Sequence, residues 1–473
     1  MQESLLYDVN RGTKAGPFPV PPFHHFVGSP MGAFIRKHSS KLRVVHDLSW
    51  PPGSSINTHI DETLCTLQYI MIDDAVEHVI RYGKDTLMAK LDIKNAYKHI
   101  IVDPHDWHLL GLSWPSVNGV TEYYIDLTLP FGLRSSPYLF DQFARGLQFI
   151  MESKGVTDVE HYLDDFFTCG PPNTDICHVN LVKMIEACDE SGFEINPDKL
   201  VSETTSLEFL GIIIDSELMQ LQISPERLSC IYDELKLWNN RKSCTKRELL
   251  SIIGKLSFIC RVVKSGRTFL RRMIDLSKTA KYLHFKVKLN KEFREDIKWW
   301  LDYLPIWNGV SVIAASNWYN NIDLHLYTDS SDKGIGCIFK SDWFLVPFTG
   351  PRAMLKCQSI NWRELYAIVK AIATWGELLK NMKLLMYCDN ESVTYIVNSG
   401  TSRNADIMKL VRCLFYLCAH YNIDYRCEHI AGVNNTASDL LSRMNVPMFF
   451  STMPSASKTM TMPESFLYDG MLI

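Results

Sequence analysis

The sequence predicts an α+β fold divided among several domains. The chain has 473 residues, which is enough for two to four domains. Residues 31–222 and residues 323–444 each alternate short β-rich runs with helical stretches. Residues 223–315, between them, have a helical pattern and a strongly basic composition. Hydrophobic residues make up 46% of the chain and charged residues 22%, proportions typical of a globular protein with buried cores.

The two ends of the chain differ in composition from these zones. Residues 1–30 are rich in Pro, Gly and aromatic residues, so we expect an extended segment there. Residues 445–473 are rich in Met, Ser, Pro and Thr, so we expect a disordered tail. No stretch approaches the roughly 18 uncharged apolar residues of a membrane span, and the start has no secretory signal pattern. With 13 cysteines in no framework spacing, the sequence predicts an intracellular protein of the cytoplasm or nucleus that is neither secreted nor bound to membranes.

The first alternating zone carries three acids in strand-like runs. Asp92 ends the run "TLMAKLD", and Asp164 and Asp165 lie in "HYLDDFFTCG". Neighbouring strand residues face opposite ways, so two adjacent acids share a site only beside a turn, and "DDFFTCGPP" offers one. Three such carboxylates cannot all stay charged unless a cation lies among them, and oxygen ligands favour Mg²⁺ or Mn²⁺. Two such ions about 4 Å apart would clamp an in-line phosphoryl transfer.

Three motifs in this zone resemble those of reverse transcriptases. "LDIKNAYKHI" is similar to their first catalytic motif, "LPFGLRSSPYLF" follows it, and "YLDD" is similar to their signature turn, all in the family's order. The resemblance implies a right-hand polymerase, with fingers and palm in residues 31–222 and a helical thumb or connection in residues 223–315. It also implies that Asp92 and Asp164 are the principal ligands of two Mg²⁺ or Mn²⁺ ions, with Asp165 as the third carboxylate.

The resemblance extends to residues that would bind the incoming nucleotide. Tyr97 matches the aromatic steric gate, whose ring crowds a ribose 2′-OH and so favours deoxynucleotides. Phe131 and Gly132 lie in the segment that supports the nucleotide and the template base, where glycine permits a close backbone approach. Arg43 matches the fingers arginine that pairs with the triphosphate, because its planar fork suits phosphate oxygens. Lys37 is expected beside it.

Two later motifs also resemble the family. "GFEINPDKL" matches its next motif, and Lys199 there is expected near the departing pyrophosphate, although a plain surface lysine fits the sequence equally well. "LEFLGIIID" resembles the primer-grip hairpin. Leu210 and Gly211 would therefore contact the primer through their backbone rather than take part in the chemistry.

The helical zone concentrates positive charge. Residues 236–298 hold 18 Lys and Arg but only 5 Asp and Glu, a local charge of +13, whereas the whole chain carries −4. One interpretation is a solvated helical face, and the other is a surface that follows the phosphates of a primer and template. Within the zone, Pro225 and Glu226 follow Ser224 and signal a helix start, and Thr245 with Glu248 predicts a capping box.

The second alternating zone carries four acids and a histidine at predicted element ends. Asp329, Glu364, Asp389 and Asp439 fall in "YTDSSDKG", "WRELYAIVKAI", "KLLMYCD" and "SDLLSR", and His429 lies ten residues before the last acid. The order, with "H-x-x-G-x-x-N-x-x-x-D-x-L-S-R", resembles the RNase H domain of retroelements. The resemblance implies an RNase H-like α/β domain, a second pair of metal ions on the four acids, and a histidine that shuttles protons. It also implies an RNA–DNA hybrid as substrate.

Other candidate sites carry less weight. Cys413, Cys418 and Cys427 with His429 fit no standard zinc spacing, and core cysteines are the simpler interpretation. "GIG" at residues 334–336 lacks the context of a phosphate loop and reads as a hairpin turn. The aromatic run "WWLDYLPIW" is more typical of packing between domains than of a base-stacking platform. Acid–base catalysis by Asp164, as in a glycosidase, has no second feature to support it.

The finer resemblance is to DIRS-like retrotransposons, carried by segments such as "GPFPVPPFHHFVGSPMGAF" and "CTKRELLSIIGKLSFICRVVKSGRTFLRRMIDL". It implies RNA- and DNA-directed DNA synthesis with RNase H cleavage, and as partners an RNA template, a DNA primer, an RNA–DNA hybrid and dNTPs. DIRS-like elements integrate with a tyrosine recombinase. No recombinase region follows Arg443, so we expect a separately encoded one. The alternative is a decayed or domesticated copy that binds nucleic acid without catalysis.

Overall fold

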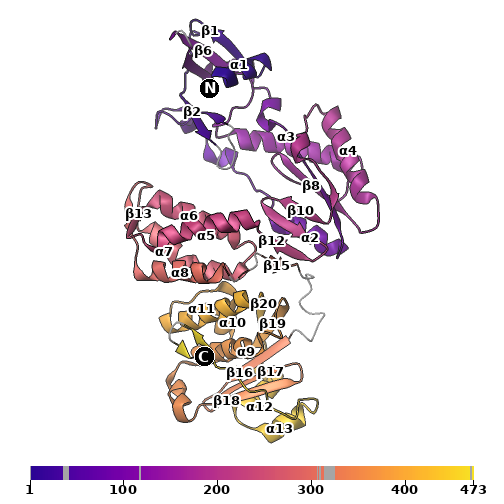
Figure 1. Cartoon of the computed structure of the whole chain (residues 1–473), viewed down its shortest axis with the longest axis vertical. Coiled ribbons are helices and arrows are strands. Elements are labelled where there is room, and N and C mark those ends of the chain that lie inside the picture. Colours follow the sequence, from indigo (N-terminus) through magenta and orange to yellow (C-terminus); the bar gives the residue numbers. More distant parts are fainter. Residues whose placement is uncertain are drawn as a thin grey trace. The chain divides into compact units, whose positions relative to one another are not determined.

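The structure is a computed structural model that describes residues 2–35, 42–116, 119–305, 307, 310–313, 325–468 and 471–472. Its contacts divide the chain into two compact units, Met1–Leu210 and Gly211–Ile473. Figure 1 shows the helices and strands of both units in the order of the chain. Within the described residues, no helix combines the length and the apolar character that crossing a membrane requires.

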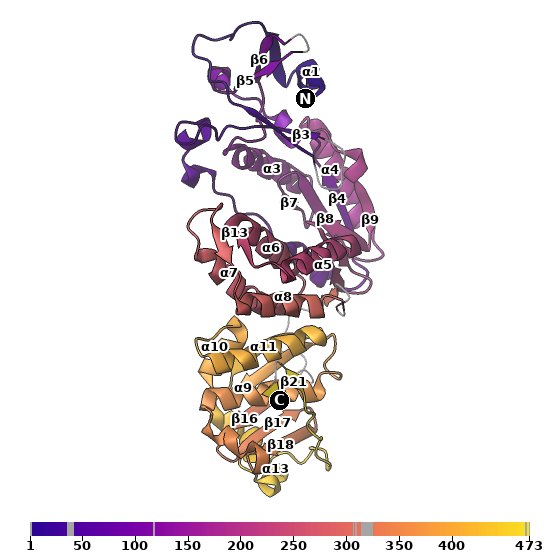
Figure 2. The same cartoon turned by 60° about the vertical axis from the view of Figure 1, so that its left-hand side comes forward.

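The first unit is built around an antiparallel sheet with the strand order β7-β8-β4-β9. Helices α3 and α4 pack side by side against this sheet (Figure 2), and α2 packs against β8. Phe140 and Leu147 of α3 and Met184 of α4 meet Leu91 and Phe166 of the sheet in one buried core. The elements are β4 (Leu87–Asp92), β7 (Glu160–Tyr162), β8 (Asp165–Gly170), β9 (Val201–Thr204), α2 (Ile72–Tyr82), α3 (Ser136–Ser153) and α4 (Ile176–Glu190).

Two smaller groups of strands complete the first unit. Strands β1, β6 and β5 form a sheet in that order, and β2 pairs with β3. The bounds of these strands are β1 (Lys14–Phe18), β2 (Met31–Ile35), β3 (Leu42–His46), β5 (Gly111–Pro115) and β6 (Thr121–Asp126). The last strand of the unit, β10 (Ser206–Phe209), belongs to neither group.

The N-terminal segment differs from the extended chain predicted for residues 1–30. It begins with a helix, α1 (Gln2–Asn10), before β1. Leu5 of this helix is 1% exposed and packs against Leu112 and Tyr124 of the three-stranded sheet. That apolar contact stabilises the helix, and the Pro- and Gly-rich composition of the surrounding residues did not reveal it.

The second unit begins with the helical zone. Strands β11, β12 and β15 form an antiparallel ladder, and β13 pairs with β14 between helices. Thr245 and Glu248 form the predicted capping box: Glu248 N donates to Thr245 Oγ1 at 3.2 Å, and Thr245 N donates to Glu248 Oε2 at 2.7 Å. The elements are β11 (Ile212–Asp215), β12 (Gln220–Gln222), α5 (Pro225–Asn239), β13 (Ser243–Thr245), α6 (Lys246–Ile259), α7 (Arg271–Lys278), β14 (Lys286–Lys288), α8 (Lys291–Tyr303) and β15 (Val310–Val312).

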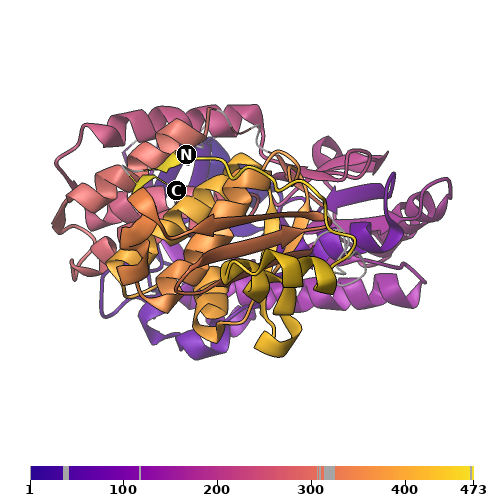
Figure 3. The same ribbon diagram turned by 90° about the horizontal axis from the view of Figure 1, so that it is seen from below.

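A five-stranded sheet with the order β18-β17-β16-β19-β20 follows. β16, β19 and β20 run parallel, and β17 and β18 are antiparallel. Helix α9 covers one face with α11 beside it, and α12 and α13 lie on the other face (Figure 3). The elements are β16 (His325–Ser330), β17 (Gly334–Phe339), β18 (Asp342–Pro347), α9 (Ile360–Trp375), β19 (Lys383–Cys388), α10 (Glu391–Ser399), α11 (Ala405–His420), β20 (Asp424–His429), α12 (Thr436–Ser442), α13 (Val446–Thr452), β21 (Leu467–Tyr468) and β22 (Met471–Leu472).

The aromatic run in α8 packs inside the second unit. Trp299, Trp300 and Tyr303 are buried, and Tyr303 Oη donates to the carbonyl oxygen of Ala419 in α11 at 3.0 Å. The run is therefore a packing element, as predicted, but it packs within one compact unit.

The tail is not the disordered segment predicted for residues 445–473. Phe449 of α13 is fully buried in a cluster with Ile338 and Trp343 of the sheet. Trp343 Nε1 donates to the carbonyl oxygen of Ser457 at 2.8 Å, and Thr461 N donates to the carbonyl oxygen of Trp343 at 2.9 Å. Composition alone missed these anchors, because two aromatic residues in a polar stretch are enough to hold it against a sheet.

Candidate active sites

The first carboxylate cluster forms where β4 ends beside the turn between β7 and β8. Asp92 lies directly opposite Asp165 in the antiparallel pair of β4 and β8. The backbone N–H of Ile93 donates to the carbonyl oxygen of Asp164 at 2.9 Å. Leu163 and Asp164 alone separate the two strands, and Leu163 adopts a φ of 54°. The turn therefore falls inside "YLDD" rather than after it as predicted, because the left-handed residue permits a two-residue reversal.

Polar neighbours surround Asp92, which is only 3% exposed. Asn196 Nδ2 donates to Asp92 Oδ1 at 3.2 Å, and Lys199 Nζ donates to Asp92 Oδ2. Burial raises the pKa of Asp165 to about 6, and the charges of Asp164 and Asp92 push it in the same direction. Lys199 is therefore an ion-pair partner of this cluster rather than a plain surface lysine.

One pocket of about 700 Å³ joins five of the ten predicted residues of the first unit. Tyr97 lies on the short 3-10 helix Ala96–His99, directly after β4. Its ring packs against Phe131 at a centroid distance of 4.9 Å and against Phe140 at 5.7 Å. The predicted residues that line the pocket are Asp92, Tyr97, Phe131, Asp164 and Lys199.

Gly132 holds the neighbouring loop against β3. It adopts a φ of 120°, and a Cβ atom there would lie 1.9 Å from the carbonyl oxygen of His46. His46 N donates to the carbonyl oxygen of Phe131 at 3.0 Å, and Asn57 Nδ2 donates to that of Gly132 at 2.8 Å. The close approach of Gly132 in this structure is thus to the protein's own backbone.

Sequence reasoning missed a buried charge cluster in the wall of the same pocket. Asp126 is fully buried and accepts from Lys14 Nζ and, at 3.3 Å, from Lys98 Nζ, while His46 Nδ1 lies 3.0 Å from its other oxygen. Burial alone would raise the pKa of Asp126, but Lys14 first, then His46 and Lys98, hold it well below its usual range. The one available signal was an acid in the apolar strand run "YYIDLTL".

Four further residues are predicted to lie in the fingers or in the primer-grip hairpin. Lys37 lies outside the described residues, and Arg43 lies in β3 opposite Phe34. Leu210 and Gly211 are the two residues between β10 and β11, with φ values of 50° and 78°, so the predicted hairpin turn is present.

The second cluster gathers the five residues predicted in the last zone. Their elements meet at one edge of the five-stranded sheet, around a pocket of about 640 Å³. Asp329 lies near the end of β16, Glu364 in the first turns of α9, and Asp389 directly after β19. His429 ends β20, and Asp439 lies in α12. All five line the pocket.

Glu364 is the most constrained acid of this pocket. Its Oε1 accepts from the backbone N–H of Ser330 at 3.0 Å, and its Oε2 accepts from Cys388 Sγ at 3.7 Å. Among the described residues, Glu364, Cys388 and Asp389 are the one group of three with potential metal-ligand atoms all within 4.8 Å of one another. Sequence reasoning weighed other cysteines and missed Cys388. Burial raises the pKa of the Cys388 thiol well above its usual value, which favours the protonated thiol as the donor to Glu364.

The acids of this pocket repel one another. Burial raises the pKa of Asp329 to about 6, and the Asp389 and Asp439 charges add to this effect. Burial, then Asp329 and Asp389, raises the pKa of Glu364 well above its usual value. Four carboxylates are an oxygen donor set, so the residues present fit Mg²⁺ or Mn²⁺, whose charge would relieve this repulsion.

The remaining polar groups fix the rim of the pocket. His429 Nε2 lies 3.2 Å from the carbonyl oxygen of Asp389, and Arg443 Nε donates to Asp439 Oδ1 at 2.7 Å. Asn435, the asparagine of the quoted H-x-x-G-x-x-N motif, donates from Nδ2 to the carbonyl oxygen of Thr328 at 3.0 Å. That bond anchors the loop before α12 next to Asp329, a role that the motif alone did not reveal.

Two segments of the chain match known families. Residues 35–214 match the family "Reverse transcriptase (RNA-dependent DNA polymerase)", and residues 321–419 match the family "RNase H-like domain found in reverse transcriptase". The chain therefore contains a reverse transcriptase domain followed by an RNase H-like domain. The second match ends before His429 and Asp439.

Relatives and solved structures agree with this arrangement. The chain is 24% identical over 431 residues to the Transposon Tf2-3 and Tf2-7 polyproteins of Schizosaccharomyces pombe, which covers 87% of this chain. The chain spans about 28% of the length of these relatives. Among solved structures, the foamy viral protease-reverse transcriptase dRH in complex with double-stranded DNA is similar with a TM-score of 0.51 and 14% identity, over 91% of this chain and 69% of that one. The predicted fold, a right-hand polymerase followed by an RNase H-like domain, is confirmed.

Proposed function

We propose that this chain is an RNA- and DNA-directed DNA polymerase of a retrotransposon that also cleaves the RNA strand of RNA–DNA hybrids. The observation that carries the proposal is the meeting of Asp92, Asp164 and Asp165 where β4 faces the β7–β8 turn of a reverse transcriptase domain. The second carboxylate pocket, in an RNase H-like domain, supports the nuclease activity. The substrates proposed are an RNA template, a DNA primer, dNTPs and an RNA–DNA hybrid.

Both pockets have the donors that two divalent cations need. When bound, Mg²⁺ or Mn²⁺ supplies positive charge to the attacking and leaving oxygens of an in-line displacement. Asp92 and Asp164 of the first pocket, with Asp165 opposite Asp92 in the strand pair, would hold the ions. In the second pocket the ligands would be Asp329, Glu364, Asp389 and Asp439.

Other residues of the first unit select and orient the nucleotide. The Tyr97 ring, braced by Phe131, excludes a 2′-OH, and the Gly132 loop supports the base. Arg43 and Lys37 bind the triphosphate. Lys199, which pairs with Asp92, faces the departing pyrophosphate when nucleotide is bound. Leu210, the last residue of the first unit, and Gly211, the first residue of the second, contact the primer through their backbone. Support comes from the shared pocket of Tyr97, Phe131 and Lys199.

The second unit guides and cleaves the hybrid. His429, on the rim beside Asp389, moves a proton during hydrolysis, since an imidazole titrates near neutral pH. The basic region 236–298 follows the phosphates of the duplex and makes its binding depend on salt.

The deciding experiment is dNTP incorporation on poly(rA)·oligo(dT) with Mg²⁺ or Mn²⁺. We expect the wild-type chain to incorporate dNTPs. If well-folded protein incorporated no dNTP, the alternative of a decayed, nucleic-acid-binding copy would remain. Asp164→Asn should abolish synthesis and spare hybrid cleavage, and Asp389→Asn should do the reverse. If either substitution removed both activities from folded protein, the proposal of two independent sites would be wrong.

We also propose that the parent element is DIRS-like and that a separately encoded tyrosine recombinase integrates its product. Support comes from the segments quoted above, which span both units. The check is the genomic sequence around the coding region. A neighbouring reading frame with a tyrosine recombinase would support the assignment, and a retroviral-type integrase frame in its place would refute it.

A further inference from the structure

We propose that residues 281–288, between α7 and α8, form a surface that binds an unpaired nucleic-acid strand, with bases stacked on Tyr282 and Phe285 and phosphates neutralised by Lys281, Lys286 and Lys288. We call these eight residues the aromatic–lysine surface. These residues lie within the basic region 236–298, and the proposal goes beyond the duplex phosphate contacts proposed for that region. It rests on the proposed function only in that the chain binds nucleic acid. The surface lies outside both carboxylate pockets.

The surface exposes large apolar side chains that its own core does not use. Tyr282 is 50% exposed, Leu283 46% and Phe285 44%. In the same segment Val287 is 3% exposed and Leu289 1%, so the alternation of β14 already supplies the buried anchors. A contiguous exposed apolar patch on a folded domain marks an interaction site more often than a single exposed residue does.

The backbone of this surface is held in place. Lys246 N donates to the carbonyl oxygen of Phe285 at 2.9 Å, and Arg247 N donates to that of Leu283 at 2.9 Å. These carbonyls thus satisfy donors in the first turn of α6, and Lys246 Nζ donates to the carbonyl oxygen of Ala280 at 2.7 Å. A surface fixed in this way loses little conformational entropy when a ligand binds.

The charge around the surface suits a polyanion. From residue 276 to residue 291 the chain has five lysines and no acid. The nearest acid before this stretch is Asp275, and it already accepts from Arg271 Nε at 3.1 Å and from Lys278 Nζ at 3.2 Å. Lys291 is likewise 3.8 Å from Glu295 Oε1, so the cations that remain for phosphates are Lys281, Lys286 and Lys288.

The aromatic geometry favours unpaired bases over a duplex. The rings of Tyr282 and His284 are stacked at a centroid distance of 5.9 Å and an interplanar angle of 12°, and Lys281 Nζ lies 5.3 Å from the Tyr282 centroid. Flat exposed rings beside cations are the combination on which single strands stack. A duplex buries its base faces, so it would meet the lysines but not the rings. Base stacking and phosphate contacts do not depend on the sugar, so RNA and DNA should bind alike.

The first test is photo-crosslinking of the full chain to a single-stranded oligonucleotide that carries 5-iodouracil, in an RNA arm and a DNA arm. We expect crosslinks within the tryptic peptide 282–286 in both arms and far fewer with a blunt duplex of the same sequence. Crosslinks confined to other peptides, or equal crosslinking by the duplex, would overturn the proposal.

The second test measures affinity by fluorescence anisotropy. Tyr282→Leu and Phe285→Leu keep apolar area but remove the ring, and each should weaken single-strand binding about tenfold. Tyr282→Phe is the matched control and should bind like the wild type. Lys286→Ala and Lys288→Ala should each lower the salt slope by about 0.7.

The outcomes separate this proposal from the proposed function. If Tyr282→Leu leaves single-strand binding unchanged while synthesis and duplex binding persist, only the aromatic–lysine surface is refuted. If the wild-type chain binds neither strand nor duplex, both proposals are wrong. If the leucine variants change the oligomeric state in light scattering but not strand binding, the surface is a contact between copies of the chain, and the proposal is wrong.

Discussion

Lys199 donates a hydrogen bond from Nζ to Oδ2 of Asp92, so the acid at the end of β4 is paired with a cation of the protein itself. Asp92 is 3% exposed, and Asn196 occupies its other oxygen. Burial favours a neutral or paired carboxylate, and the lysine supplies that pairing. A divalent cation held by Asp92, as proposed above, would therefore compete with Lys199 for the same carboxylate.

We expect Lys199→Met to make the stability of the protein more dependent on Mg²⁺. Without metal the variant should lose about 1 kcal/mol, a modest figure because the Lys199 side chain is 46% exposed. Added Mg²⁺ should restore most of this loss. Thermal unfolding with and without Mg²⁺ measures both the loss of stability and its recovery. The control is Lys154→Met. Lys154 Nζ lies 2.7 Å from Glu190 Oε1, and the Glu190 side chain is 61% exposed. Equal Mg²⁺ effects on the two variants would contradict competition at Asp92.

Gly132→Ala should disrupt the loop that carries Phe131 into the first pocket. The new Cβ would lie 1.9 Å from the His46 carbonyl oxygen, and the alanine would have to adopt a φ of 120°. We expect a loss of roughly 2–3 kcal/mol in the free energy of unfolding and a large loss of synthesis. Gly146→Ala is the control, because its Cβ would meet nothing within 4 Å and Gly146 lies inside α3. It should stabilise by about 0.5–1 kcal/mol. Similar behaviour of the two variants would refute the steric argument.

Tyr97→Val should relax the choice of sugar. The ring is held against Phe131 and Phe140, so its position relative to β4 is fixed. Removing it should raise the ratio of ribonucleotide to deoxynucleotide incorporation by about tenfold or more. Tyr97→Phe keeps the ring and should keep the wild-type ratio. Single-nucleotide extension with each substrate gives the ratio, and an unchanged value for the valine variant would refute the gate.

Local patterns in the sequence predicted much of the fold. The apolar runs predicted β4 and β8, and Thr245 with Glu248 predicted the start of α6, because strand burial and helix capping depend on neighbouring residues. The order of the acids predicted both pockets. It did so through resemblance rather than spacing, since Asp329 and Asp439 meet only because β16 and α12 pack together.

What the sequence did not reveal depends on contacts between distant segments. The cluster of Lys14, His46, Lys98 and Asp126 unites residues up to 112 positions apart, and no local pattern encodes it. Cys388 approaches Glu364 because β19 and α9 are adjacent, not because of any motif. Helix α1 was missed for the same reason: its one strong anchor is the burial of Leu5 on another sheet.

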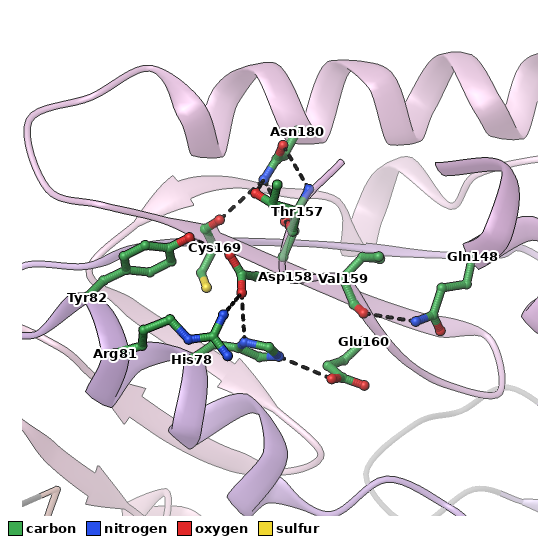
Figure 4. A network of polar contacts seen from close by, with 11 residues as sticks. His78, Arg81, Tyr82, Gln148, Thr157, Asp158, Val159, Glu160, Cys169 and Asn180 are labelled. Atoms are coloured by element: carbon green, nitrogen blue, oxygen red, sulfur yellow. Dashed lines mark hydrogen bonds and ion pairs between the residues drawn. The ribbon is translucent and has the colours of Figure 1, made fainter. Parts of the chain in front are cut away.

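A cluster around Asp158 should make stability depend on pH (Figure 4). His78 lies 2.9 Å from Asp158 Oδ1 and 3.1 Å from Glu160 Oε1, and Arg81 joins Asp158. The bond to Glu160, then the Asp158 charge, raises the pKa of His78 above the ordinary value of about 6.5. The stabilisation is therefore complete below pH 6.5 and is lost as the pH rises through the raised pKa.

Comparison of the wild type with His78→Gln by urea unfolding tests this dependence. The wild type should be more stable by about 1 kcal/mol at pH 5.5, and the difference should shrink at pH 8.5. His105→Gln is the control, because its side chain is 96% exposed and its loss should matter at neither pH. A difference that grew with pH would contradict the sign of the linkage.

Phe449→Ala should destabilise the RNase H-like domain through the tail. Phe449 is fully buried, and its ring lies 5.2 Å from that of Trp343 in β18. Its helix follows α12, which carries Asp439, so a loosened α13 should also disturb the second carboxylate pocket. We expect a loss of about 3 kcal/mol in urea unfolding, together with reduced hybrid cleavage. Met448→Ala is the control, because Met448 directly precedes Phe449 in the same helix and is 56% exposed. It should cost under about 0.5 kcal/mol. Equal effects of the two substitutions would mean that Phe449 does not anchor the tail. A loss of hybrid cleavage in the Phe449→Ala variant alone would show that the second pocket depends on the tail after α12.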